Sequence, residues 1–280
     1  MKTRFSKKNI VPVGLLLLLF SLLFLAWRNH IVNYTDPEGH LLQGYHADSS
    51  KPFDGSLRVV SWNLHFGEKL DDVVATLENA SELQDTDLLL LQEINAEGVE
   101  RIAGRLRYNY IYHPTVFSRK RQSEYGIAIL SKWPLYDPEK IMLPNWLPGW
   151  VENRFAVKAV TKINGKDVTV YNTHFDLMWM EPQGEFLAKE VARRKTFSIL
   201  GGDFNTWRPG SVSFLEDKLK DAGLERLTEG IGYTFESNSL KFTLDHIFSL
   251  EGLDYTAGVY RQTDASDHYP GWVDINLQEE

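Results

Sequence analysis

Residues 197–206, FSILGGDFNT, place an acid and an amide directly after an apolar run. Asp203 and Asn205 stand two positions apart, so on an extended chain their side chains leave from the same face. The glycines at 201 and 202 allow a sharp turn and the close approach of a ligand. A buried strand that ends in a carboxylate and a carboxamide is suited to holding a hard cation or a phosphate oxygen. Taken alone, the stretch is equally consistent with a strand that ends in an Asp/Asn turn.

Other apolar runs of the chain end in the same kinds of side chain. The residues concerned are Asn63, Glu93, His174, Asp245 with His246, and Asp267 with His268. Each one singly is more typical of a turn or a helix cap than of a site. If the runs are strands whose polar ends meet at one rim, however, they form a single acidic cleft that also carries imidazoles.

Apolar periodicity predicts the elements that would position these residues. Buried or half-buried strands are expected at residues 57–62, 87–91, 108–112, 126–130, 154–162, 167–172, 255–261 and 272–277. The turn Asn164-Gly165 predicts a hairpin between two of them. Helical spacing predicts helices at residues 69–80, 97–107, 183–194 and 213–220. Strands therefore outnumber helices, which indicates a mixed α and β domain.

Composition and charge exclude several kinds of site. The 280 residues contain no cysteine, which rules out disulfides, zinc–thiolate sites and a thiol nucleophile. Five of the 30 Lys and Arg residues and none of the 38 acids lie in residues 1–30, so the remainder has 25 basic residues and a net charge of −13. Such an acidic body argues against a non-specific electrostatic grip on nucleic acid.

The first 30 residues differ from the rest of the chain. Four positive charges precede an apolar run at residues 10–27, which predicts a membrane anchor or signal segment over residues 1–30. A cleaved signal peptide has the same charge layout and remains an alternative. Residues 31–56 read as a linker, and residues 57–280 as the globular domain. The N-terminus is expected in the cytoplasm and the globular domain outside it, in the periplasm or the extracellular space.

Seven short motifs in order resemble those of the endonuclease/exonuclease/phosphatase superfamily, the DNase I-like metal-dependent phosphohydrolases. They are residues 61–64 (SWNL), 91–93 (LQE), 126–131 (GIAILS), 172–174 (NTH), 201–205 (GGDFN), 244–247 (LDHI) and 266–268 (SDH). The resemblance covers nearly all of residues 57–280. It implies an α+β fold, a four-layer α/β/β/α sandwich of two mostly antiparallel sheets with helices outside.

The resemblance also implies roles for individual residues. Asn63, Glu93 and Asp267 match positions at the metal site, and their oxygen atoms suit Mg²⁺, with Mn²⁺ as a substitute. His268 matches a general base and Asp245 the group that orients it. Asp203 and Asn205 would position the attacking water and the phosphate, and His174 would stabilise charge or assist the leaving group. Arg154 and Tyr125 match phosphate-contacting positions.

The expected activity is therefore Mg²⁺-dependent hydrolysis of a phosphoester by a membrane-tethered enzyme, without an obligate protein partner. A lipid or small phosphoester is the first candidate substrate, because the body is acidic and two loops, 146–150 and 177–180, are unusually apolar. These loops are as consistent with core packing as with exposure. An extracytoplasmic nuclease is the alternative activity, and a catalytically silent binding module on the same fold is the alternative of another class.

Overall fold

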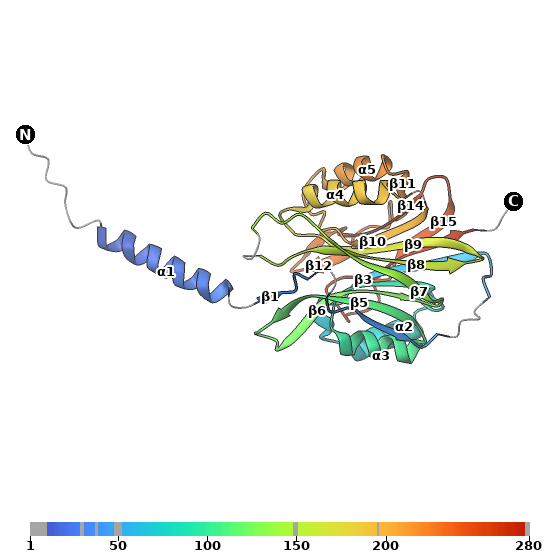
Figure 1. Ribbon diagram of the computed structural model, residues 1–280, viewed down its shortest axis with the longest axis horizontal. Helices are drawn as coiled ribbons and strands as arrows, with labels where there is room; N and C mark the ends of the chain where they lie inside the picture. Colours follow the sequence, from blue (N-terminus) through green and yellow to red (C-terminus); the bar gives the residue numbers. More distant parts are fainter. Residues whose placement is uncertain are drawn as a thin grey trace, which may run out of the picture.

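The computed structural model describes residues 10–28, 31–36, 39–47, 52–147, 151–194 and 196–277. Two β-sheets lie face to face in the centre of the body (Figure 1). Helices α4 (Met180–Ala192) and α5 (Ser211–Lys220) cover one sheet, and α2 (Leu70–Asn79) and α3 (Ala96–Leu106) cover the other. The order of layers is therefore α/β/β/α, as the family resemblance implies.

The first sheet has eight strands in the order β1-β5-β6-β4-β3-β16-β15, with β2 paired to β5. Its strands are β1 (Ile31–Asn33), β2 (Leu42–Tyr45), β3 (Ser56–Asn63), β4 (Leu88–Ile94), β5 (Asn109–Ser118), β6 (Ser123–Ser131), β15 (Asp254–Val259) and β16 (Gly271–Asn276). All of its pairs are antiparallel except β3 with β4.

The second sheet has six strands in the order β11-β14-β10-β9-β8-β7. Its strands are β7 (Leu135–Met142), β8 (Phe155–Ile163), β9 (Lys166–His174), β10 (Phe197–Asp203), β11 (Leu224–Arg226) and β14 (Asp245–Leu250). Here β9 and β10 form the parallel pair. A separate hairpin is made of β12 (Phe235–Ser237) and β13 (Leu240–Phe242).

Three apolar clusters hold the layers together. Strand residues such as Val59, Leu90, Val157 and Ile199 fill the space between the two sheets. The outer face of the first sheet packs on α2 and α3, and the outer face of the second packs on α4 and α5. The apolar runs of β4 and β10 are buried on both faces for this reason, which explains why they lack the polar alternation of a surface strand.

The four predicted body helices are confirmed to within a few residues. The prediction of a linker over residues 31–56 needs correction, because β1 and β2 within it pair with β5 as edge strands. Their Gly- and Asp-rich surroundings are compatible with this role, since an edge strand needs only one hydrogen-bonded neighbour.

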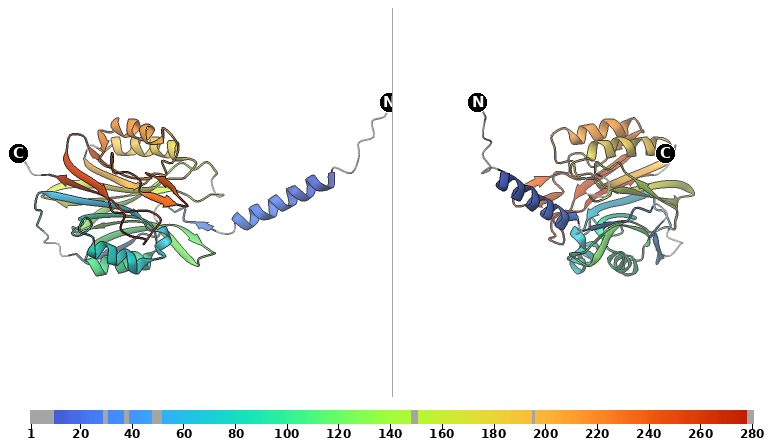
Figure 2. Two further views of the ribbon diagram at one scale, coloured as in Figure 1. Left: turned by 180° about the vertical axis from the view of Figure 1, so that it is seen from behind. Right: turned by 60° about the vertical axis from the view of Figure 1, so that its left-hand side comes forward.

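Helix α1 (Ile10–Arg28) projects away from the body (Figures 1 and 2). Seven of its large apolar side chains are exposed: Leu15, Leu16, Leu17, Leu18, Leu19, Phe20 and Leu23. Within the described ranges, no helix meets the length and hydropathy needed to cross a bilayer, in contrast to the transmembrane segment that the sequence predicts at residues 10–27.

Candidate active site

Strand register brings three of the predicted residues into one row. The parallel pair β9–β10 sets His174 beside Asp203, and the antiparallel pair β10–β14 sets Asp203 beside Asp245. Parallel strands end at the same edge of a sheet, and an antiparallel neighbour begins there. The acid that ends β10 therefore lies between an imidazole and a second acid.

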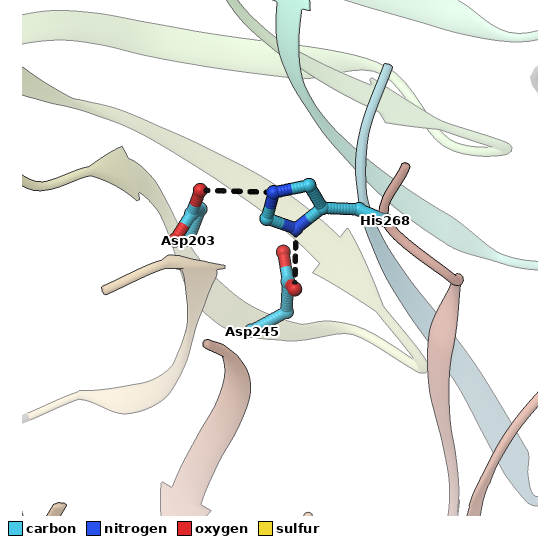
Figure 3. Close-up of side chains that lie close together, drawn as sticks. All are labelled: Asp203, Asp245 and His268. Carbon is cyan, nitrogen blue, oxygen red and sulfur yellow. Dashed lines mark hydrogen bonds and ion pairs between the residues drawn. The ribbon is translucent and has the colours of Figure 1, made fainter. Parts of the chain in front are cut away.

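His268 lies between the two acids of this row (Figure 3). Its Nδ1 is 2.8 Å from Asp245 Oδ2, and its Nε2 is 3.8 Å from Asp203 Oδ2. A hydrogen bond joins the loop that carries His268 to β3, because Trp62 Nε1 donates to the His268 carbonyl at 2.9 Å. The ring of Phe235 packs on the imidazole with 4.9 Å between centroids. The predicted pairing of Asp245 with His268 is thus present.

The hydroxyl of Thr234 holds Asp245 in position through hydrogen bonds. It donates to Asp245 Oδ2 at 2.6 Å and accepts from the backbone N–H groups of Leu244 and Asp245 at 3.0 and 3.1 Å. Asp245 Oδ2 thus accepts two hydrogen bonds, from Thr234 and His268, which fixes the carboxylate plane.

The first sheet contributes Asn63 and Glu93 at the ends of its own parallel strands. A β-bulge between Gln92 and Ile94 interrupts the pairing of β4 with β6, and Glu93 at the bulge has φ 53°. Asn63 Nδ2 donates to Asp203 Oδ2 at 3.0 Å and lies 3.4 Å from Glu93 Oε1. Asn63 therefore connects the acids of the two sheets.

Arg154 fixes the tautomer of His174. Its Nη1 lies 3.0 Å from His174 Nδ1 and 3.3 Å from Glu152 Oε1. A guanidinium only donates, so Nδ1 accepts and the imidazole hydrogen sits on Nε2. That nitrogen is 3.4 Å from Asp203 Oδ2. Burial, together with the nearby charges of Arg154 and His268, lowers the pKa of His174 well below its usual value, so this contact is one of a neutral imidazole.

The two glycines before Asp203 serve a different purpose from the one expected. A Cβ at Gly202, whose φ is 146°, would lie 2.0 Å from the carbonyl oxygen of Thr173 on β9. A Cβ at Gly201 would lie 2.5 Å from Leu90 of the opposite sheet. Gly202 therefore permits close packing of β10 on β9, and Gly201 permits close packing of the two sheets.

Burial sets unusual pKa values at the centre of the site. It raises the pKa of Asp203 to about 7, although His268 acts in the opposite direction. Burial alone would lower the pKa of His268, but Asp245 and Asp203 outweigh it and raise that pKa to about 10. Asp203 and His268 thus share one buried system of interacting charges, and the base role of His268 stays a prediction.

The acidic groups fit a divalent cation. Burial raises the pKa of Glu93 more than Arg154 and His268 lower it, so a cation beside this carboxylate would favour its charged form. Carboxylate oxygens also come from Asp203 and Asp267, and Asp203, Asp245 and His268 offer ligand atoms within 4.8 Å of one another. Because Asp245 and His268 already bind each other, we favour Glu93 as the principal ligand. The oxygen of Asn63 accepts from His65 N at 3.1 Å, so its ligand role stays a prediction.

A cleft of about 630 Å³ contains this constellation. Its polar lining residues are Asn63, His65, Glu93, Arg154, His174, Asp203, Asn205, Asp267 and His268. The apolar ones are Phe66, Leu177, Trp207, Phe235, Leu240, Phe242 and Leu244. Tyr125 is buried, packs its ring on Phe66 at 4.9 Å and is not among the lining residues, so its phosphate-binding role stays a prediction. His246 is also buried, behind the cleft, against the hydroxyl of Thr206 at 2.8 Å.

The sequence pointed to the apolar loop that contains Leu177, but not to His65, Thr234 or the apolar residues of the β12–β13 hairpin. His65 stands two positions after Asn63, and its Nδ1 contacts Asp267 Oδ1 at 3.0 Å, so its spacing was an available signal. Thr234 and the β12–β13 hairpin had no such signal, because the contact of Thr234 with Asp245 and the pairing of Phe235 with His268 form only in the folded chain.

Comparison with known proteins agrees with this architecture. The endonuclease/exonuclease/phosphatase family matches residues 60–268. A UPF0294 protein of Vibrio campbellii is 26% identical over 239 residues, covering 81% of this chain and 80% of that protein.

Solved structures share the fold at low identity. An endonuclease/exonuclease/phosphatase of Beutenbergia cavernae superposes with a TM-score of 0.65 at 20% identity, over 80% of this chain and 72% of that one. The D. rerio TDP2 structure complexed with single-strand DNA product gives 0.63 at 18% identity, over 80% and 100% of the two chains.

The family match covers strands of both sheets and every residue of the central constellation from Asn63 to His268. Membership of this kind supports a phosphoester hydrolase or nuclease-type activity that generally depends on a divalent metal. The chain belongs to the endonuclease/exonuclease/phosphatase family.

Proposed function

We propose that this protein is a Mg²⁺-dependent hydrolase of phosphoester bonds. The observation that carries the proposal is the position of His268 between Asp203 and Asp245, in the same cleft as Glu93 and Arg154. Phosphoryl transfer to water needs a base and compensation of negative charge. The two acids can supply the base, and the charged imidazole and the guanidinium can compensate the charge.

Each side chain has a distinct part in this reaction. Asp203 accepts a proton from the attacking water, because its pKa near neutrality lets it do so at the pH of most cells. His268, held charged by Asp245, and Arg154 stabilise the phosphoryl oxygens. His174 donates its Nε2 hydrogen and holds Asp203 in place. Glu93, with Asp267 and Asn63 as candidate partners, would hold a divalent cation, which would supply further positive charge to the phosphate.

Hydrolysis of bis(4-nitrophenyl) phosphate and 4-nitrophenyl phosphate by the full chain tests this proposal. Turnover is expected with Mg²⁺ and not with EDTA. Asp203→Ala and His268→Ala should each reduce kcat by at least about a hundredfold. His46→Ala is the matched control, since His46 pairs with Glu100 outside the cleft. A fully active His268→Ala variant would contradict the proposed chemistry.

Metal binding has a readout that does not depend on turnover. A cation bound only by the folded chain stabilises it by about 2.7 kcal/mol at a hundredfold excess over Kd. We expect Mg²⁺ to raise Tm in the wild-type protein and to have little effect on Glu93→Gln. A chain that binds Mg²⁺ in this way but hydrolyses no phosphoester would instead be a silent binding module.

A nuclease is the second candidate. The D. rerio TDP2 structure contains a single-strand DNA product, and Trp207 and Phe66 line this cleft where bases could stack. Cleavage of single-strand DNA in preference to the nitrophenyl esters and to lipids would favour this activity.

Attachment to a membrane through residues 10–27, with the body outside the cytosol, is part of the proposal. It is supported by the exposed leucines of α1 and by the positive charges before them. Carbonate extraction of membranes from cells that express the chain tests the attachment, and protease added to intact spheroplasts tests the side on which the body lies. A chain that stays with the soluble fraction would contradict it.

A further inference from the structure

The cleft combines one guanidinium that could bind a phosphate, that of Arg154, with a wall of apolar side chains. Among its described lining residues, Arg154 alone is a lysine or arginine. Phe66, Leu177, Phe235 and Leu240 lie on the same cleft, and Leu177 and Leu240 are 50% and 60% exposed. A nucleic-acid strand is held by several cations along its backbone, whereas one phosphoester next to an apolar group needs only this arrangement.

The apolar surface continues beyond the cleft. Met178 and Trp179 follow Leu177 and are 55% and 38% exposed, and Trp146 and Leu147 are 43% and 39% exposed. Gln183 joins these two loops, because its Oε1 accepts from Asp176 N at 2.7 Å and its Nε2 donates to the Pro144 carbonyl at 2.9 Å. Exposed tryptophans beside aliphatic side chains are typical of surfaces that enter a lipid interface.

Basic side chains border the same rim. The turn of the β5–β6 hairpin carries Arg119, Lys120 and Arg121. Arg121 lies over the ring of Phe66 with 4.1 Å to its centroid and forms an ion pair with Glu68, so this basic turn reaches the mouth of the cleft with the charge of Arg121 partly compensated. A cluster of cations next to an apolar surface is complementary to an anionic bilayer.

Helix α1 leaves the body at this end as well. Strand β1, which follows α1, lies against the loop before Arg154, because Asn33 Nδ2 donates to the Val151 carbonyl at 2.8 Å and Asn153 N donates to Asn33 Oδ1 at 2.9 Å. Figures 1 and 2 show α1 at the end of the body opposite the C-terminus. The apolar helix, the basic turn and the mouth of the cleft therefore belong to one end of the molecule.

From this juxtaposition we infer that the cleft end docks on an anionic lipid bilayer and that the site hydrolyses the phosphoester of a membrane lipid. The inference rests on the proposed hydrolase function. The apolar part of the lipid lies against the wall of Leu177 and Leu240, and its phosphate against Arg154 and His268. Water gives a proton to Asp203 as its oxygen bonds to phosphorus, one P–O ester bond breaks with its electron pair on the alcohol oxygen, and that oxygen takes up the proton that Asp203 received.

Reconstitution of the full chain into vesicles of phosphatidylcholine and phosphatidylglycerol tests the inference. Release of the lipid products and hydrolysis of added bis(4-nitrophenyl) phosphate are measured in the same sample. In the double variant Leu147→Asp/Met178→Asp, the ratio of lipid turnover to soluble-ester turnover should fall at least tenfold. Tyr45→Asp is the control, because Tyr45 is 67% exposed on β2, away from the cleft, and should leave the ratio unchanged.

The outcomes separate the two proposals. Soluble-ester turnover without lipid turnover, cleavage of single-strand DNA alone, or an unchanged ratio in the double variant overturns the lipid inference and leaves the hydrolase function standing. Turnover of no phosphoester at all overturns both. A second readout is independent of turnover: in a Trp27→Phe background, brominated phosphatidylcholine should quench tryptophan emission, and adding Trp146→Phe/Trp179→Phe should remove most of that quenching. Equal quenching in this variant would show that the cleft end does not touch the bilayer.

Discussion

The amide of Gln92 donates to Asn172 Oδ1 at 2.7 Å and so joins the two sheets in the interior of the molecule. Asn172 in turn donates to the carbonyls of Leu91 and Ala128 at 3.0 and 2.8 Å. Gln92 directly precedes Glu93, and Asn172 lies two residues before His174. This bridge therefore fixes the distance between the half of the site on β4 and the half on β9.

Replacement of Asn172 by leucine should remove the bridge and leave several buried polar groups without their hydrogen-bond partner. Because unsatisfied buried donors and acceptors are expensive, we expect a loss of about 2–4 kcal/mol in the free energy of unfolding, with a parallel loss of kcat. Urea denaturation measures the first effect. Asn79→Ala, at an exposed amide on α2, is the control and should change stability by less than about 0.5 kcal/mol. An Asn172→Leu protein as stable as the control would show that the bridge is unimportant.

Thr234 is predicted to position the Asp245–His268 pair. Thr234→Val keeps the shape but loses the hydroxyl that contacts Asp245 Oδ2 and two backbone N–H groups. We expect kcat to fall about tenfold to a hundredfold, and stability to fall by about 1–3 kcal/mol. Thr234→Ser restores the hydroxyl and should recover most of the activity. If Ser and Val variants behave alike, the hydroxyl does not position the pair.

Gly202 should not tolerate a side chain. Gly202→Ala places a Cβ 2.0 Å from the Thr173 carbonyl, and the strands must separate to relieve the clash. We expect destabilisation by more than about 3 kcal/mol, measured as a shift of the urea midpoint. Gly104→Ala in α3 is the control, since nothing lies within 4 Å of its Cβ position, and it should stabilise the protein by about 0.5–1 kcal/mol.

His113 makes stability depend on pH. Burial, with the charge of Lys140, lowers its pKa from 6.5 to about 4, and neither ring nitrogen has a hydrogen-bond partner among the residues that the structure describes. Between pH 6.5 and pH 4 this histidine is protonated in the unfolded chain and neutral in the folded chain. Its contribution to the free energy of unfolding is therefore complete above pH 6.5 and is lost as pH falls towards 4. We expect His113→Phe to lose about 2–3 kcal/mol less than the wild-type protein between pH 7 and pH 4.5.

Urea denaturation at the two pH values measures this difference. His246, which burial keeps neutral with a pKa of about 3, acts in the same direction and is present in both proteins. Parallel loss of stability in wild type and His113→Phe would mean that His113 does not contribute.

The sequence by itself determined the chemical groups and the elements that carry them. Apolar runs such as those of β4 and β10 are local, and so are the acids and amides that end them, which is why Glu93, Asp203 and Asn205 were predictable. The helices from α2 to α5 were predictable for the same reason, because their apolar spacing lies within a few turns.

Only the tertiary structure decided how these groups face one another. Register between strands distant in sequence placed Asp203 between His174 and Asp245 and raised its pKa by burial. The contribution of Thr234, the exposure of Trp146 and Met178, and the pairing of β1 with β5 depend on neighbours from other parts of the chain. Local patterns cannot determine them, because burial and pairing are properties of the whole packed molecule.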